Sequence, residues 1–122
     1  MDRVVPMLNV PDVRATAAWY ETIGFVTQRT HEEKDGQTTW ALLTYGSTEI
    51  MLNAGGHPSD AWRRDVDLYV NTRGVDRLHE MLRDRVAIHE APHDTEYGQR
   101  EFIIRDLNGF WITFGEPMKP RV

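Results

Sequence analysis

Residues 4–25 read VVPMLNVPDVRATAAWYETIGF, and within this stretch the spacing of the apolar residues changes from that of a strand to that of a helix. The segment Val4–Val10 is rich in β-branched and apolar residues, which predicts a strand ending at Pro11-Asp12, a breaker followed by a helix N-cap. Apolar residues then recur at helical spacing from Val13 until Gly24, a residue suited to a left-handed helix C-cap. The stretch therefore predicts a strand followed by a helix of about three turns.

The rest of the chain continues this order and then repeats it. After the first helix, the pattern predicts strands at residues 25–31, 38–45 and 49–53. The second round predicts a strand at 66–70, a helix with Val75, Leu78, Met81 and Leu82 on one face, and strands at 86–89, 100–105 and 110–115. Val10 and Val70 are 60 positions apart in a chain of 122 residues, as a duplicated βαβββ unit would place them.

Glycine, proline and short polar residues interrupt both periods at 54–60, which predicts a linker there. We expect a single domain over residues 1–122, made of module 1 at about 1–53, a linker at about 54–64 and module 2 at about 65–122. The fold class is α+β. In each module a helix covers one face of a four-stranded sheet, and the other face needs a partner module as its cover.

Composition excludes several classes of function. The chain has 19 acidic and 14 basic residues, a formal charge of -5, and no basic run, which argues against nucleic acid and anionic membranes as partners. The absence of cysteine excludes disulfides, thiolate metal sites and thiol nucleophiles. No apolar stretch near the N-terminus is long enough for a signal peptide or a membrane span, so we expect a cytoplasmic protein.

The segment His89-Glu90-Ala91-Pro92-His93 formally matches the H-E-x-x-H motif of zinc proteases. That motif works only when both histidines project from an intact helix, and a proline inside it removes a hydrogen bond and clashes with the preceding turn. We therefore interpret the segment as a strand end that enters a polar loop.

Aromatic residues on predicted strands or adjoining loops are more informative. The set is Trp40, Trp62, Tyr69, Tyr97, Phe102 and Trp111. Half or more of them are expected in the core, because aromatic side chains commonly fill sheets. Trp62 lies in a polar segment and is the least explained by core packing, which favours the docking of a planar ligand. The nearby carboxylates Asp60, Asp65 and Asp67 either attract a cation or belong to a solvated loop.

Three segments together resemble the vicinal oxygen chelate superfamily of glyoxalases, bleomycin-resistance proteins and dioxygenases. They are Val5–Val13, Trp19–Phe25 and Tyr97–Gly109, the last with an aromatic-Gly-x-Arg-Glu-Phe motif. Leu107 departs from the proline often found in the family's turn. The resemblance covers essentially the whole chain and implies paired βαβββ modules, whose curved mixed sheets enclose a ligand cavity that a homodimer commonly completes.

Enzymes of this superfamily hold a divalent metal through His, Gln or Glu at four strand positions. The resemblance places these positions at Val5, Met51, Asp65 and Thr113. Only Asp65 could donate a strong oxygen ligand, and one carboxylate with one threonine hydroxyl does not hold a divalent ion against water. We expect no metal and no other cofactor.

The chain is most similar to the bleomycin-resistance members, which lack those ligands and sequester a cationic, partly aromatic drug at a dimer interface. The resemblance implies a homodimer that binds an antibiotic-like small molecule, with Tyr97 beside the ligand groove. The expected ligand-binding residues are Tyr97, Trp62, Trp40, Trp111, Asp65, Met51, Glu101 and Thr113. Two alternatives stay open. One is an enzyme, either a lyase, isomerase or dioxygenase with displaced metal ligands or a metal-free catalyst with Asp65 or Glu101 as general base; the other is a dimerising module of a larger assembly.

Overall fold

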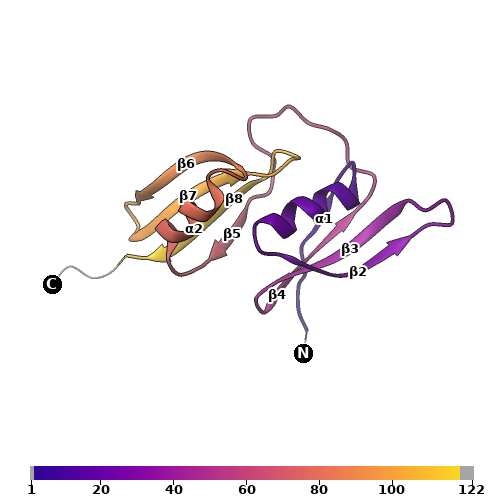
Figure 1. The fold of residues 1–122 in the computed structure, drawn as a ribbon, viewed down its shortest axis with the longest axis horizontal. Helices are drawn as coiled ribbons and strands as arrows, with labels where there is room; N and C mark the ends of the chain where they lie inside the picture. Colours follow the sequence, from indigo (N-terminus) through magenta and orange to yellow (C-terminus); the bar gives the residue numbers. More distant parts are fainter. Residues whose placement is uncertain (1, 119–122) are drawn as a thin grey trace. The chain divides into compact units, whose positions relative to one another are not determined.

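The computed structural model describes residues 2–118 and divides after Ser59 into two compact units (Figure 1). Unit 1 contains β1 (Met7–Asn9), α1 (Val13–Thr22), β2 (Val26–Glu32), β3 (Thr38–Tyr45) and β4 (Thr48–Asn53). Unit 2 contains β5 (Leu68–Asn71), α2 (Val75–Leu82), β6 (Ala87–Asp94), β7 (Gln99–Arg105) and β8 (Trp111–Pro117). The predicted α+β class with two βαβββ modules is confirmed. Between residues 2 and 118, no helix has the length and apolar character needed to cross a membrane.

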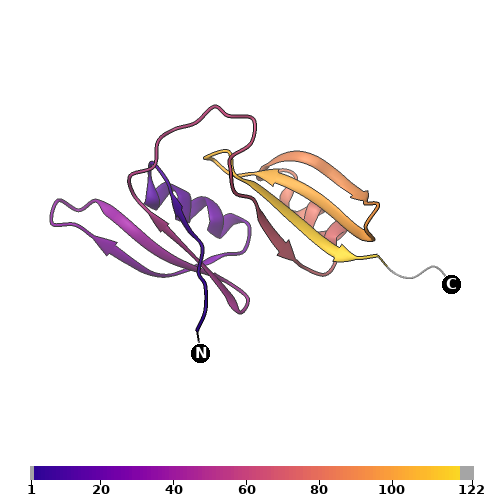
Figure 2. The same cartoon turned by 180° about the vertical axis from the view of Figure 1, so that it is seen from behind.

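Both sheets have the same topology. Sheet 1 has the strand order β1-β4-β3-β2, and sheet 2 has the order β5-β8-β7-β6. The first strand of each unit pairs in parallel with the last, and the remaining pairs are antiparallel. Each sheet carries its unit's helix on one face, which Figures 1 and 2 show from opposite sides.

The helix starts differ in chemistry. The Asp12 carboxylate accepts a hydrogen bond of 2.9 Å from the backbone N–H of Ala15 and caps α1. Helix α2 follows Gly74, which has no capping side chain, and Glu116 of β8 accepts bonds of 2.9 Å from the backbone N–H groups of Gly74 and Val75. The capping carboxylate therefore lies about forty residues away in the sequence, which a local pattern cannot reveal.

The predicted buried face of α2 is wrong at one position. Val75 and Leu82 are buried, but Met81 is 59% exposed. It lies six residues after Val75, outside the stripe that recurs every three or four residues. The His79 ring instead packs edge-on against Phe102, with ring centroids 5.4 Å apart.

The internal repeat is offset by 62 residues rather than 60. The N-cap positions are Asp12 and Gly74, and the pair Met7–Met51 in unit 1 corresponds to Tyr69–Thr113 in unit 2. The predicted strand from Val66 is also displaced, because β5 begins at Leu68 and extends through Asn71. A short apolar run fixes no register by itself. As a result the counterpart of Val5 is Asp67, not Asp65.

Candidate functional site

The two faces of sheet 2 carry different kinds of side chain. Phe102 and Phe114 stack with ring centroids 5.0 Å apart on the face that α2 covers. Because side chains alternate along a strand, Glu101, Ile103, Trp111, Thr113 and Gly115 lie on the opposite face. Figure 2 views sheet 2 from behind, with α2 beyond the strands. We call this surface the far face of sheet 2.

A carboxylate with two phenol donors lies on the far face. Glu101 is only 4% exposed, and its Oε2 and Oε1 atoms accept hydrogen bonds of 2.7 Å each from the hydroxyl groups of Tyr69 and Tyr97. Between residues 2 and 118, no Lys, Arg or His forms an ion pair with Glu101. A buried carboxylate without a cationic partner is costly, so this arrangement is a feature that ordinary packing does not explain.

Gly115 makes room for this arrangement. Glu101 and Gly115 are directly paired on β7 and β8, and a Cβ atom at Gly115 would overlap the hydroxyl group of Tyr69. The missing side chain lets the Tyr69 ring lie across the sheet and reach Glu101. Glycine weakens a strand, and it is typically found in strands where another group approaches the backbone closely.

Both tyrosines keep their protons. Burial, followed by the hydrogen bond to Glu101, raises the pKa of Tyr69 well above its ordinary value. The hydrogen bond to Glu101, followed by burial, also raises the pKa of Tyr97. Each phenol therefore acts as a donor to the carboxylate, and Glu101 keeps lone pairs for a third donor.

An aromatic cluster occupies the other end of the far face. The indole ring of Trp111 lies 4.3 Å from the His89 ring and 6.3 Å from the Trp62 ring, centroid to centroid. The Arg63 guanidinium lies 4.5 Å from the Trp111 ring centre. Trp62 is 68% exposed, so the cluster offers an accessible aromatic surface.

The loop that carries Trp62 is held in place by its neighbours. Arg63 forms an ion pair with Asp67, which raises the pKa of the guanidinium through a side-chain hydrogen bond. Arg64 donates a 2.8 Å hydrogen bond to the carbonyl of Asn108 in the β7–β8 turn. The indole N–H of Trp111 also donates to the carbonyl of Trp62 at 3.2 Å. These contacts fix a segment that has no regular secondary structure.

The structure places the sequence-predicted site residues in two groups. Unit 2 holds Tyr97, Glu101, Thr113, Trp62, Trp111 and Asp65, and unit 1 holds Trp40 and Met51. Within unit 2 the structure joins Tyr97 with Glu101 and Trp62 with Trp111, while Asp65 is an exposed residue ahead of β5. In unit 1, Met51 pairs with Leu42, two residues beyond Trp40 on β3.

The four positions that the superfamily uses for a divalent metal do not fit one here. With the corrected register they carry Val5, Met51, Asp67 and Thr113, and Asp67 is already paired with Arg63. A valine and a methionine offer no oxygen donor to a hard cation, and one carboxylate with one hydroxyl is too few. Over residues 2–118, no group of three or more His, Cys, Asp or Glu side chains is placed to hold a metal ion.

Sequence reasoning missed two functional candidates. Tyr69 belongs to the aromatic set but was not selected, because its contact with Glu101 spans 32 residues of sequence. His89 was considered only within the H-E-x-x-H match, and the strand end predicted there is wrong, because strand β6 continues through the whole segment to Asp94. The sequence signal for Tyr69 is the alternation of side chains along β5, which places the Tyr69 ring on the face away from its apolar neighbours.

Comparison with solved structures shows several proteins of similar fold. A bleomycin-binding protein complexed with bleomycin is 19% identical, with 95% of this chain and 98% of that chain covered and a TM-score of 0.71. A bleomycin resistance determinant encoded on the transposon Tn5 is 20% identical, with 96% and 98% covered and a TM-score of 0.71. A glyoxalase-related enzyme from Clostridium phytofermentans is 19% identical, with 97% and 96% covered and a TM-score of 0.75.

At these identities the likeness shows the fold alone, and the three proteins include a bleomycin-binding protein, a resistance determinant and an enzyme. No curated protein sequence matches the chain. A family model described as the Glyoxalase/Bleomycin resistance protein/Dioxygenase superfamily matches residues 1–114. Together with the two βαβββ units, this match shows that the chain belongs to the glyoxalase, bleomycin resistance protein and dioxygenase superfamily.

Proposed function

We propose that this protein binds a planar, cationic small molecule on the far face of sheet 2, without a metal and without breaking a bond. The observation that carries the proposal is Glu101, a buried carboxylate with two phenol donors and no cationic partner among the described residues. A cationic ligand would provide the missing positive charge, and hydrogen bonds to charged groups are among the stronger ones in proteins.

The aromatic cluster supplies the second half of the proposed site. Trp62 and Trp111 offer rings to a planar group, and Glu101 offers a charge to a cationic group. Arg105 pairs with Trp111 and lies four residues beyond Glu101 on β7. At about 3.4 Å per residue, the two ends are about 14 Å apart along the strand. The ligand that fits this spacing is elongated, with a planar end and a cationic end.

The sequence resemblance makes this proposal more specific, because it suggests binding of the bleomycin-resistance type. One solved structure of similar fold is a protein complexed with bleomycin. In the proposal the protein is a cytoplasmic homodimer that sequesters an antibiotic or a similar natural product, and Tyr97, Asp65 and Thr113 of unit 2 also contribute to the site. Nucleic acid and membranes are not partners.

Calorimetric titration with metal-free bleomycin tests the proposal. We expect saturable binding of one ligand per chain, weakened about 10- to 100-fold by Glu101→Gln, because one charge-assisted hydrogen bond is lost. Tyr97→Ala or Trp62→Ala should weaken binding about tenfold through lost stacking. The matched control is Glu80→Gln, which removes one negative charge on α2, on the opposite side of sheet 2.

Two results would contradict the proposal. Equal affinity in the Glu101→Gln and Glu80→Gln variants would show that only the overall charge matters. Conversion of the ligand, detected by mass spectrometry of the mixture after incubation, would favour the enzyme alternative instead. Circular dichroism of each variant checks that the fold is intact.

A further inference from the structure

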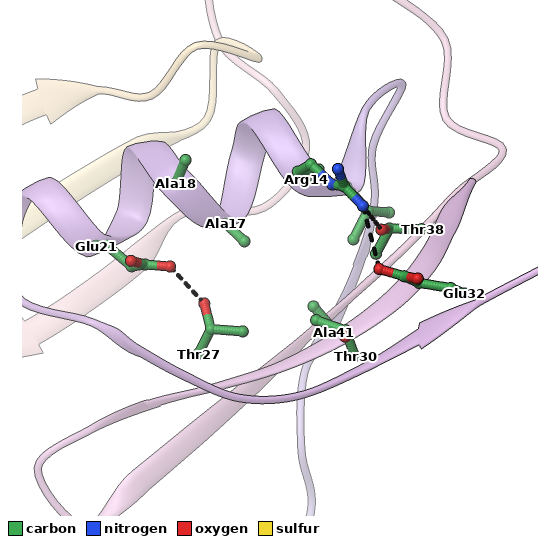
Figure 3. Close-up of a pocket in the computed structure, with 10 residues that line it drawn as sticks. Arg14, Ala17, Ala18, Glu21, Thr27, Thr30, Glu32, Thr38 and Ala41 are labelled. Carbon is green, nitrogen blue, oxygen red and sulfur yellow. Dashed lines mark hydrogen bonds and ion pairs between the residues drawn. The ribbon is translucent and has the colours of Figure 1, made fainter. Parts of the chain in front are cut away.

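A pocket lies in unit 1, whereas the site proposed on sheet 2 belongs to unit 2. Figure 3 shows it between α1 and the strands β2 and β3, and its volume is about 310 Å³. Ligand pockets in proteins begin at about this size.

The pocket exists because both walls carry small side chains. Ala17 of α1 and Ala41 of β3 are buried and form the floor. The edge strand β2 contributes Thr27 and Thr30, where a bulky apolar side chain would fill the gap under a helix. The pairing of β2 with β3 has two register shifts, and these interrupt the regular alternation of side chains along β2. The gap is therefore a consequence of residue size.

Charged groups lie at both ends of the apolar floor. At one end, an Nη2 of Arg14 lies 3.1 Å from Oε1 of Glu32 and 3.2 Å from the hydroxyl oxygen of Thr38. At the other end, Oε1 of Glu21 accepts a 2.9 Å hydrogen bond from the hydroxyl group of Thr27. Arg14 and Glu21 are seven residues apart on α1, which is about 10 Å along the helix axis.

The charges do not cancel. Glu32 is neutralised by Arg14, whereas Glu21 forms no ion pair with any residue between 2 and 118. Its Oε1 atom accepts the hydrogen bond from Thr27 in the pocket lining, and a carboxylate oxygen keeps a lone pair for a further donor. One surplus negative charge next to a small apolar channel favours a ligand with a single positive end and a short hydrocarbon chain.

We infer that this pocket binds a short linear primary alkylammonium ion. The ammonium group lies at Glu21 and Thr27, where a carboxylate and a hydroxyl oxygen both accept its hydrogen bonds. The alkyl chain runs over Ala17 and Ala41 towards the Arg14–Glu32 pair. Five carbons fit within the space, because n-pentylamine has six non-hydrogen atoms and the pocket volume of about 310 Å³ is that of a small ligand pocket.

Titration of the full chain with n-pentylamine at pH 7, followed by amide NMR shifts, tests the inference. We expect saturable shifts at Ala17, Thr27 and Ala41. The neutral analogue n-pentanol has the same length and should bind at least tenfold more weakly, because it lacks the charge that Glu21 pairs with. Equal binding of the two compounds, or shifts that never saturate, would overturn the inference.

Two variants separate the pocket from the overall field of an acidic protein. Glu21→Gln keeps the shape and should weaken n-pentylamine binding about tenfold, whereas Glu80→Gln removes an exposed helix carboxylate elsewhere and should leave it unchanged. Ala18→Leu enlarges an exposed residue of the lining and should abolish binding. Equal loss in Glu21→Gln and Glu80→Gln, or unchanged binding in Ala18→Leu, would contradict the inference.

Discussion

At the scale of single residues, Glu101 and Tyr69 form the most informative contact in unit 2. A carboxylate normally avoids burial unless it has partners, and here both partners are neutral phenols. Their contribution to stability depends on the protons they keep. Because the folded protein raises the pKa of Tyr69, the protonated phenol is favoured more strongly in the folded state than in the unfolded one.

An alkaline titration is the first prediction. The stabilising contribution of Tyr69 is complete below the ordinary tyrosine pKa of about 10 and decreases as the pH rises towards the higher pKa of the folded state. NMR signals of the tyrosine ring Cζ atoms should show Tyr69 and Tyr97 ionising at higher pH than a model phenol. Glu101→Gln should lower the pKa of both tyrosines towards the ordinary value. Unchanged titration in that variant would contradict the hydrogen-bonded arrangement.

The second prediction concerns Gly115. In most strands a Gly→Ala change is neutral or stabilising, because it restricts the unfolded chain. Here the new methyl group would overlap the hydroxyl group of Tyr69, so Gly115→Ala should move the ring away from Glu101. The Tyr69 pKa should then fall towards its ordinary value while circular dichroism stays native. Gly36→Ala is the control, because a Cβ atom at Gly36 would contact no other group. The positive φ of Gly36 adds backbone strain to that variant.

Part of this arrangement lies within a single sequence motif. Tyr97 and Glu101 follow from a motif of adjacent residues, and the structure joins them directly. Tyr69 and Gly115 belong to other strands, so their meeting depends on the β5–β8 register and on a missing side chain. A local sequence pattern indicates which side chains share one face of a strand, but it does not predict which two strands are neighbours in the sheet.

At the scale of elements, α2 is a helix whose start depends on a distant carboxylate. It spans only Val75–Leu82, and helices of this length are marginal without tertiary support. Glu116 binds two of the backbone N–H groups that the helix leaves unsatisfied, and its charge faces the positive end of the helix.

Loss of this cap is the third prediction. Glu116→Ala should lower the free energy of unfolding by about 1–2 kcal/mol, because two N–H groups lose their acceptor. Glu116→Gln keeps one acceptor oxygen and should lower the free energy of unfolding by a smaller amount. Asp12→Ala removes the side-chain cap of α1 and serves as the comparison, at about 1 kcal/mol. Urea denaturation measures all three values, and an unchanged midpoint for Glu116→Ala would contradict the capping role.

Element boundaries show why a local sequence pattern predicts strand positions better than strand register. Strand β3 was predicted at Thr38–Tyr45 and has those bounds, because its apolar and aromatic run has turn residues on both sides. Strand β5 was predicted too early, since the acidic and apolar residues before Leu68 also alternate. The error of two residues moved one metal-equivalent position from Asp67 to Asp65.

At the scale of the whole molecule, each unit has about 60 residues and its own core. Val10, Tyr20 and Leu52 are buried in unit 1, and Phe102 and Phe114 are buried in unit 2. A unit of about 60 residues buries a smaller share of its surface than a larger domain and is marginally stable alone. Each helix covers only one face of its sheet, so stability also depends on what covers the other face.

The fourth prediction is that a second copy of the chain provides part of this cover. Met7 and Tyr69 occupy equivalent positions on β1 and β5, on the faces without a helix, and they are 52% and 48% exposed. A partner chain that covers these side chains would remove apolar surface from water, which favours association. We expect sedimentation to give twice the chain mass of 14.2 kDa. The unfolding temperature should rise with protein concentration, because dimerisation stabilises the folded state by mass action.

A matched pair of variants tests whether that face is the one involved. Met7→Lys places a charge on the face without a helix and should shift the equilibrium towards the monomer, because burying an unpaired charge is costly. Met81→Lys places the same charge on the exposed side of α2 and should leave the equilibrium unchanged. A mass of one chain at every concentration would contradict dimer formation. Weakening by Met81→Lys without weakening by Met7→Lys would show that the interface involves α2 instead of the face without a helix.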